Sequence, residues 1–139
     1  MAWLVVPNSG SIKILWQEIT ALSDEQKTRL RGENIGFIFQ SFNLLPYLTV
    51  AQNIDLVLDL NKLERRFSTE EIATLVWLWN KLDRYPTQLS GWEQQRVGIA
   101  RALVGNTTLI LADEPTGNLD KKTSQQIMGA SEIFIQTIW

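Results

Sequence analysis

Two short, almost wholly apolar segments are the feature that most constrains the fold of this chain. Residues 34–39 read Asn-Ile-Gly-Phe-Ile-Phe, and residues 108–112 read Thr-Leu-Ile-Leu-Ala. Strands that are buried on both faces show continuous apolar runs instead of alternation, and they are typical of parallel sheets covered by helices. The chain is therefore expected to be built around a buried parallel sheet.

Helix-start signals stand before the first of these strands and between the two. Ser23 and Thr49 each come before a helical pattern and are good N-cap residues. Ser68 and Glu71 form a capping-box pair that opens a further helix. Apolar residues at helical spacing extend this helix as far as Trp79.

The remaining elements complete an α/β pattern. A short strand is expected over residues 11–15, and the helix after Ser23 should stop near Gly32. Ser90 should cap a helix over residues 93–104, and a last helix is expected over residues 123–133. The order of strands and helices indicates an α/β protein with a helical insertion.

Composition excludes several classes of function. The 139 residues fit one domain, and a net charge of -2 gives no electrostatic reason to expect nucleic acid as a partner. The chain has no cysteine and no histidine, so disulfides, thiolate chemistry and a histidine base are absent from it. No apolar run approaches the roughly 18–20 residues that span a bilayer, which makes a cytosolic protein the default.

Two acidic residues follow the second apolar strand. Asp113 and Glu114 would lie at the carboxyl edge of the sheet, where open α/β folds bind ligands. One carboxylate could hold Mg²⁺ while the other orients or deprotonates a water molecule. Taken alone, two acids after a strand are more often part of a solvated turn.

Two further segments carry weaker signals of their own. Ser90 and Gly91 precede a helix, where a hydroxyl, free N–H groups and the helix dipole could receive an anion; the alternative is a plain N-cap. Gln40 follows the first apolar strand, and its carboxamide could bind a water or a metal. A single glutamine at such a position is also an ordinary loop residue.

The order and spacing of these segments, from about Pro7 to about Met128, resemble the ABC transporter ATPases. Residues 112–120 and 42–46 are most similar to the branch serving lipoprotein release and macrolide export. The segments that carry the resemblance are similar to the Q-loop (35–40), the LSGGQ signature (89–96, Leu-Ser-Gly-Trp-Glu-Gln-Gln-Arg), the Walker B strand (109–114) and the D-loop (117–120).

The resemblance implies catalytic roles for the residues at the sheet edge. It assigns Asp113 to Mg²⁺ and Glu114 to the general base that activates water. Gln40 would contact the metal, sense the γ-phosphate of ATP and link the site to a membrane partner.

The resemblance also implies a site shared by two subunits. The signature residues would contact ATP bound by a second ABC ATPase subunit in a head-to-tail dimer, and Asp120 would cross the dimer interface. These nucleotide-binding signature residues are Ser90, Gly91, Trp92, Glu93 and Gln94.

The implied fold is a P-loop NTPase-type ABC ATPase core with an inserted helical subdomain. Residues 1–139 would form one partial ABC ATPase domain, with the helical subdomain over residues 48–88 and the signature helix over residues 90–104. The implied partner is an integral membrane permease, which places the chain peripherally on the cytoplasmic face of the inner membrane.

Two motifs of the resembled family are missing from the sequence. There is no Gly-x-x-x-x-Gly-Lys-[Ser/Thr] phosphate loop (Walker A), and without histidine there is no switch histidine. We therefore expect a fragment whose first strands and phosphate loop are missing. Alone, it should bind ATP poorly and hydrolyse it negligibly.

Tryptophan is the second departure from the family. Four of the six tryptophans, Trp3, Trp16, Trp77 and Trp92, stand where the resembled family usually has glycine. An indole at Trp92 adds about 150–250 Å² of side chain and should obstruct the neighbouring ATP. One hypothesis is that UGA codons meaning glycine were read as tryptophan. The alternative is that the tryptophans are genuine and belong to a decayed, non-catalytic copy.

Three function classes follow from these features. The leading interpretation is the ATPase subunit of a transporter. The second is a degenerate, non-catalytic partner that dimerises with an intact ATPase or docks on a membrane subunit through residues 40–47. The third is the class of DNA-repair and chromosome-structure ATPases. It is disfavoured because the segment between Gln40 and Ser90 is compact and has no long heptad run.

Overall fold

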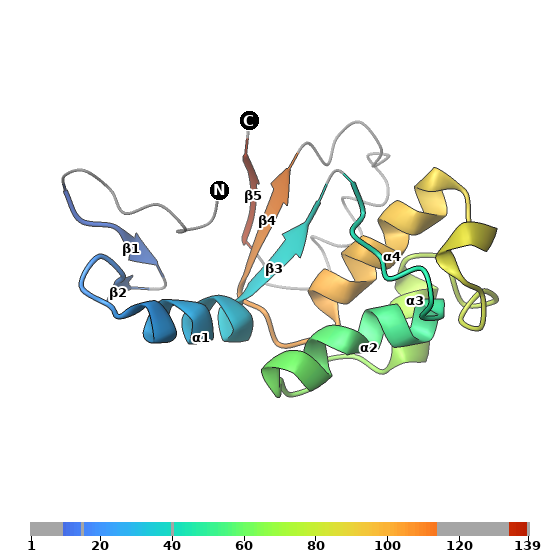
Figure 1. The fold of residues 1–139 in the computed structure, drawn as a ribbon, viewed down its shortest axis with the longest axis horizontal. Helices are drawn as coiled ribbons and strands as arrows, with labels where there is room; N and C mark the ends of the chain where they lie inside the picture. The colour runs from blue at the N-terminus through green and yellow to red at the C-terminus, as the bar shows by residue number, and fades with distance from the viewer. Residues whose placement is uncertain (1–9, 15, 40, 114–133, 139) are drawn as a thin grey trace.

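A parallel sheet lies at the centre of the molecule, as Figure 1 shows. The computed structural model describes residues 10–14, 16–39, 41–113 and 134–138. The sheet contains β3 (Ile35–Ile38), β4 (Leu109–Asp113) and β5 (Phe134–Ile138) in the order β3-β4-β5. Both neighbouring pairs are parallel, with Ile38 opposite Ala112 in the first. The α/β prediction and its two apolar strands are confirmed, whereas β5 was not predicted.

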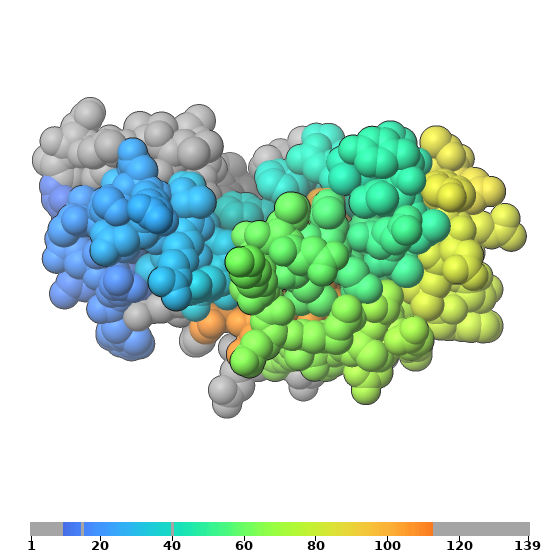
Figure 2. Space-filling model, turned by 60° about the horizontal axis from the view of Figure 1, so that its bottom comes forward, coloured from blue at the N-terminus to red at the C-terminus, as the bar shows by residue number. Residues whose placement is uncertain are grey.

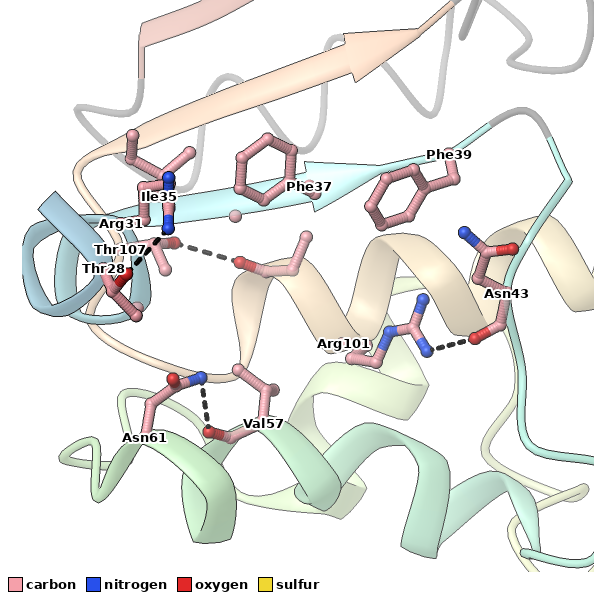
Figure 3. Close-up of a pocket in the computed structure, with 13 residues that line it drawn as sticks. Thr28, Arg31, Ile35, Phe37, Phe39, Asn43, Val57, Asn61, Arg101 and Thr107 are labelled. Atoms are coloured by element: carbon pink, nitrogen blue, oxygen red, sulfur yellow. Dashed lines mark hydrogen bonds between the residues drawn. The ribbon is translucent and has the colours of Figure 1, made fainter. Parts of the chain in front are cut away.

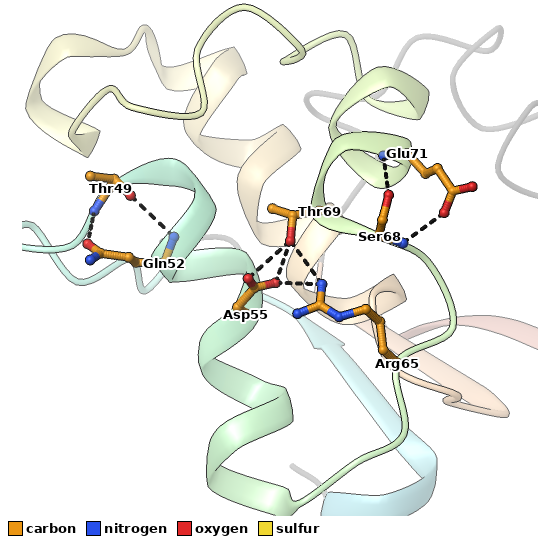
Figure 4. A network of polar contacts seen from close by, with 7 residues as sticks. All are labelled: Thr49, Gln52, Asp55, Arg65, Ser68, Thr69 and Glu71. Carbon is orange, nitrogen blue, oxygen red and sulfur yellow. Dashed lines mark hydrogen bonds and ion pairs between the residues drawn. The ribbon is translucent and has the colours of Figure 1, made fainter.

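Each of the four α-helices in the described part of the chain begins with a capping box, in which the N-cap side chain and the third helical residue bond each other's backbone N–H. Figure 4 shows two of these boxes, at Thr49 and at Ser68. The predicted N-caps are thus confirmed. The helices are α1 (Asp24–Asn34), α2 (Val50–Asn61), α3 (Thr69–Leu75) and α4 (Gly91–Leu103), and a short 3₁₀ helix, η1 (Pro86–Gln88), comes before α4.

The prediction that the first helix stops near Gly32 is wrong. α1 continues to Asn34, and β3 begins at the next residue. A Cβ atom at Gly32 would lie 2.6 Å from Oδ1 of Asn61 in α2. This glycine therefore permits close contact between α1 and α2 and does not end the helix.

The prediction that a helix continues to Trp79 is also wrong. α3 ends at Leu75, and Trp77 has a left-handed backbone with φ of 55°. The Leu78 N–H donates to the Ala73 carbonyl at 2.7 Å, which closes the helix end.

The N-terminal strand prediction is wrong in extent. In place of one strand over residues 11–15, the structure has an antiparallel hairpin of β1 (Lys13–Ile14) and β2 (Gln17–Glu18). The hairpin lies at the end of the molecule beside α1, away from the other helices (Figure 1). The helix predicted over residues 123–133 lies outside the described residues.

One apolar core joins the helices to the sheet. It is formed by β3, β4 and α2 to α4. α4 packs so closely on β3 that a Cβ atom at Gly36 would lie 2.6 Å from the Ala102 carbonyl oxygen. Figure 2 shows α2 and α3 (green) as one continuous surface in the middle of the molecule. Among the described residues, no helix is long and apolar enough to cross a membrane. The largest fully buried side chains include Ile54, Ile72, Leu78, Ile99 and Ile110.

A polar network ties α2 to the start of α3. The Arg65 guanidinium donates to Asp55 at 3.0 Å and to the Thr69 hydroxyl at 2.9 Å, and Thr69 in turn donates to Asp55 (Figure 4). The contact fixes the two helices against each other at the surface.

Candidate functional site

The carboxyl ends of β3 and β4 lie side by side. Because Ile38 pairs with Ala112, β3 and β4 end at the same edge of the sheet. In the sequence, Gln40 is the second residue after β3 and Glu114 the first after β4. This is the edge where open α/β folds bind ligands. Asp113 itself is the last residue of β4.

The side chains that the sequence assigns to this edge are not among those described. Gln40, Glu114 and Asp120 lie outside the described residues, and for Asp113 only the backbone is described. Their roles at the metal, the water and the dimer interface stay predictions.

The predicted signature segment forms the N-terminus of α4. Ser90 is the N-cap, and its Oγ accepts from the Glu93 N–H at 3.4 Å. Oε2 of Glu93 accepts from the Ser90 N–H at 2.8 Å and from the Ser90 hydroxyl at 3.0 Å. These two side chains therefore satisfy each other's polar groups at the start of the helix.

A lysine from the loop before η1 completes this polar group. The Lys81 ammonium forms an ion pair with Oε1 of Glu93. The hydrogen bond from Lys81 is the largest cause, and the bond from the Ser90 backbone N–H the second, of a pKa that is lowered to about 2 at Glu93. The carboxylate is thus ionised at neutral pH, with its charge offset by Lys81.

Gly91 and Trp92, the first two residues of α4, leave backbone donors free at the N-terminus of the helix. The N–H groups of Gly91 and Trp92 make no hydrogen bond with any residue that the structure describes. Such free donors at the positive end of the helix dipole can receive an anion. The Trp92 side chain is 57% exposed at the same place.

Gln94 faces the turn that precedes the helix. Its side-chain amide donates to the Pro86 carbonyl at 3.0 Å and to the Leu89 carbonyl at 3.3 Å. The predicted nucleotide-binding residue therefore also holds η1 against α4.

A clamp between α4 and the segment after Gln40 was missed by the sequence analysis. Nη1 of Arg101 donates to the Asn43 carbonyl at 2.7 Å, and Nη2 donates to the Phe42 carbonyl at 2.9 Å (Figure 3 shows the first). Burial lowers the pKa of Arg101. A Cβ at Gly91 would be only 3.9 Å from the Phe42 ring. The segment that follows the predicted Q-loop is thereby held against α4 and its signature end.

The loop over residues 45–49 is held by a side chain of α2. Asn53 is fully buried, and its amide nitrogen donates to the carbonyls of Leu45, Leu48 and Thr49 at 3.0–3.1 Å. Its oxygen accepts from the Leu45 N–H at 2.8 Å. The loop therefore has a defined backbone, and it presents Tyr47 with 70% of its surface exposed.

An open cavity of about 430 Å³ lies between α1, β3, α2 and α4 (Figure 3). Phe37 and Phe39, which stack with their ring centres 5.8 Å apart, line it. Of its two arginines, Arg101 is bonded to backbone carbonyls and Arg31 to the Thr28 hydroxyl. The lining is mainly apolar and offers no cluster of free donors for a phosphate among the residues described here.

Comparison with known proteins agrees with the geometry. The family model described as ABC transporter matches residues 1–117. An uncharacterized ABC transporter ATP-binding protein of Thermotoga maritima is 44% identical over 125 residues, covering 88% of this chain and 53% of that protein. A bacitracin export ATP-binding protein of Halalkalibacterium halodurans is 40% identical over 125 residues, with 88% and 49% covered.

Larger relatives and solved structures match as well. A macrolide export ATP-binding/permease protein of Chlorobium phaeobacteroides is 46% identical over 124 residues, covering 88% of this chain and 19% of that protein. The ATP-binding cassette MJ0796, solved as a dimer in a post-hydrolysis state bound to ADP and Pi, superposes with a TM-score of 0.77 at 34% identity. That match covers 96% of this chain and 64% of the cassette. The chain spans about half the length of the Thermotoga and Halalkalibacterium relatives and about a fifth of the Chlorobium one, and its fold is that of these cassettes.

Proposed function

The chain belongs to the ABC transporter family, and we propose that it is part of an ATP-hydrolysing subunit that powers export or lipoprotein release. Within that subunit it would supply the signature half of a site shared by two ATPase subunits. The observation that carries this proposal is the exposed N-terminus of α4, where Gly91 and Trp92 leave their N–H groups free beside the Ser90 cap.

The proposed nucleotide contact follows from those donors. Ser90 and Gly91 would contact the terminal phosphate of ATP held by the second subunit, with Trp92, Glu93 and Gln94 completing the signature. A dimeric, nucleotide-bound relative with the same fold supports this arrangement. In the same dimer, Asp120 would cross the interface.

The catalytic edge is proposed from the ends of β3 and β4. Asp113 and Gln40 present oxygen ligands of the kind that Mg²⁺ prefers, so these residue types fit the ion. When bound, Mg²⁺ would neutralise charge on the phosphates. Glu114 would take the proton of the attacking water, since it stands one residue beyond the strand.

The 139-residue polypeptide is proposed to be inactive alone. Its sequence contains no phosphate loop, so it lacks the backbone cradle and lysine that hold the β- and γ-phosphates. A partner chain with an intact loop would have to hold the ATP on which this chain's signature acts.

The transport context is proposed from the relatives' names. Two of them are described as bacitracin and macrolide export proteins, one of which includes a permease. A permease would dock near the loop that ends in Tyr47, placing the chain on the cytoplasmic face of the inner membrane. The helical subdomain over residues 48–88 would lie between this contact and the signature.

The exposed indole of Trp92 favours a second candidate function. Because it stands beside the free N–H groups, it could keep phosphate away from them. The chain would then be a non-catalytic partner that dimerises with an intact ATPase.

A mixing experiment tests both candidates. The chain, its Trp92→Gly variant and a Trp92→Gly/Ser90→Ala double variant would each be mixed with the cassette MJ0796 and a non-hydrolysable ATP analogue. We expect the Trp92→Gly chain to form a nucleotide-dependent heterodimer, seen by light scattering, and the double variant to form less. Equal association of the unchanged chain would favour the non-catalytic partner. No association with any variant would contradict both.

A further inference from the structure

Glu93 places a negative charge where the proposed nucleotide contact needs a positive environment. Its Oε2 accepts from the Ser90 N–H at 2.8 Å and from the Ser90 hydroxyl at 3.0 Å. The N–H groups of Gly91 and Trp92 belong to the same first turn of α4. An ionised carboxylate in this turn repels a phosphate, and a carboxylate free to turn would compete with the phosphate for the same donors.

The hydroxyl proton of Ser90 is also committed to Glu93. A serine hydroxyl has one hydrogen to donate, and here Oε2 of Glu93 accepts it. Phosphate oxygens are acceptors, so Ser90 can donate to one only when its hydroxyl turns away from Glu93. The carboxylate then loses one of its donors while its charge remains.

The Lys81 ammonium meets both needs. It is paired with Oε1 of Glu93, the oxygen that Ser90 does not use. The side chains of Lys81 and Glu93 are 34% and 24% exposed, so water screens the pair only in part. Lys81 therefore holds and neutralises the carboxylate whether or not the Ser90 hydroxyl is bonded to it.

The loop that carries Lys81 has a defined backbone. The Lys81 N–H donates at 2.9 Å to the carbonyl of Leu78, a fully buried residue. One residue further along, the Leu82 carbonyl accepts at 3.0 Å from the N–H of Ala51 in the first turn of α2. Because this loop is tied to the core and to α2, the ammonium is directed at Glu93 from a fixed position.

We propose that Lys81 is a positioning residue of the signature segment: it holds Glu93 on the Ser90 cap and cancels the charge that would keep phosphate from the start of α4. Lys81 itself does not contact the phosphate. It acts through Glu93, which leaves the Gly91 and Trp92 donors open and frees the Ser90 hydroxyl to turn. The inference rests on the proposed function, since it assumes that the signature receives a phosphate.

The test titrates the 139-residue chain with sodium tripolyphosphate, which carries the charged chain of ATP without its nucleoside. The shift of the Gly91 amide signal in NMR spectra is the measurement. The variants are Lys81→Met, Lys81→Arg and the double variant Lys81→Met/Glu93→Gln. Arg84→Met is the matched control, because it removes a positive charge from an exposed side chain of the same loop. Each is prepared with Trp92 and with Trp92→Gly, since the indole stands beside the donors.

The unchanged chain or its Trp92→Gly variant should show a saturable shift at millimolar tripolyphosphate. Lys81→Met should weaken this binding about three- to tenfold, because the carboxylate is no longer neutralised. Lys81→Arg should bind like its parent, since it keeps the charge.

The double variant separates the proposed role from a merely structural one. It should recover most of the loss, because the neutral amide of glutamine no longer repels phosphate and can still accept from the Ser90 N–H. A lysine that only held the loop in place would not be replaced by a change at Glu93.

Three results would each overturn the inference. These are an equal loss in Lys81→Met and Arg84→Met, no recovery in the double variant, and no saturable shift at Gly91 in either background. The titration uses neither nucleotide nor a second subunit. A Lys81 effect without heterodimer formation would count against the proposed function alone, and a nucleotide-dependent heterodimer without a Lys81 effect would count against this inference alone.

Discussion

The two ends of the described structure are held together in different ways. In the region from α2 to α4, all three helices contribute side chains with no exposed surface, among them Ile54, Ile72 and Ile99. In the region of β1, β2 and α1, Ile19 and Leu30 are the only buried apolar side chains among the described residues, at 3% and 8% exposure. The first region is stabilised by burial, and the second mainly by local hydrogen bonds and caps.

This difference bears on function, because the signature segment belongs to the packed region. The N-terminus of α4 is fixed by its capping box and by the shared core, so the free donors have a defined direction. The hairpin with Trp16 has no such support. The same kind of substitution should therefore have a large effect in one region and a small one in the other.

The largest contrast is expected from matched isoleucines. Ile54→Ala should lower the free energy of unfolding by about 3–4 kcal/mol, because it leaves a cavity in the core. Ile12→Ala should cost less than about 1 kcal/mol, since that side chain is 38% exposed. Urea unfolding measures both. Equal losses would contradict the contrast between the regions.

The next largest difference in stability is expected between two arginine substitutions, one in each region. Arg101→Met should cost about 2 kcal/mol, because two carbonyls lose a charged donor. Arg29→Met, which removes an exposed contact to Glu33 within α1, should cost much less, because solvent screens this ion pair. Faster protease cleavage after Phe42 in the Arg101 variant would show that the clamp holds this segment. A loss no greater than that of the Arg29 variant would argue against it.

A capping box can be removed from one helix in each region. Ser68→Ala should cost about 1 kcal/mol of global stability. Ser23→Ala should chiefly speed hydrogen exchange in α1, because this helix can fray while the core stays closed. If Ser23→Ala lowered global stability as much as Ser68→Ala, α1 would have to be counted with the core.

The smallest effect concerns acid stability. The pKa of Glu93 is lowered to about 2, so its contribution is present above its unfolded-state pKa near 4.5 and is lost as the pH falls toward 2. The loss should be below about 1 kcal/mol, because Lys81 and Glu93 are both partly exposed. Comparing the unchanged chain with Glu93→Gln between pH 5 and 2 measures it. An unchanged slope in the variant would contradict the assignment.

The sequence predicts helix starts better than helix ends. A capping box is a pattern of four adjacent residues, so the boxes at Ser68 and Ser90 can be read directly. The end of α3 depends on φ at residue 77, which tryptophan would not suggest. Gly32 looks like a stop signal, but it lies inside α1, close to the side chain of Asn61, a residue far along the chain.

The candidate site was predictable as motifs but not as contacts. From the apolar strands, a general rule of α/β folds predicts that Gln40 and Asp113 lie at one sheet edge. The clamp from Arg101 to Phe42 and Asn43 joins residues almost 60 positions apart, with bonds to backbone carbonyls that carry no sequence signal. β5 was missed for a similar reason, because only its pairing with β4 defines it.

The codons of the tryptophans at positions 3, 16, 77 and 92 address their origin. If UGA codons meaning glycine were read as tryptophan, the encoding DNA should carry TGA at these positions. TGG there would show that tryptophan is encoded, and it would favour a decayed, non-catalytic copy.

The most direct measurement of the central claim is a titration of the purified 139-residue chain with ATP and Mg²⁺. The claim is that the chain carries the signature and the catalytic edge without a phosphate cradle. It predicts no saturable binding by calorimetry in the micromolar range, for the unchanged chain and for Trp92→Gly alike. Micromolar affinity in the unchanged chain would contradict it.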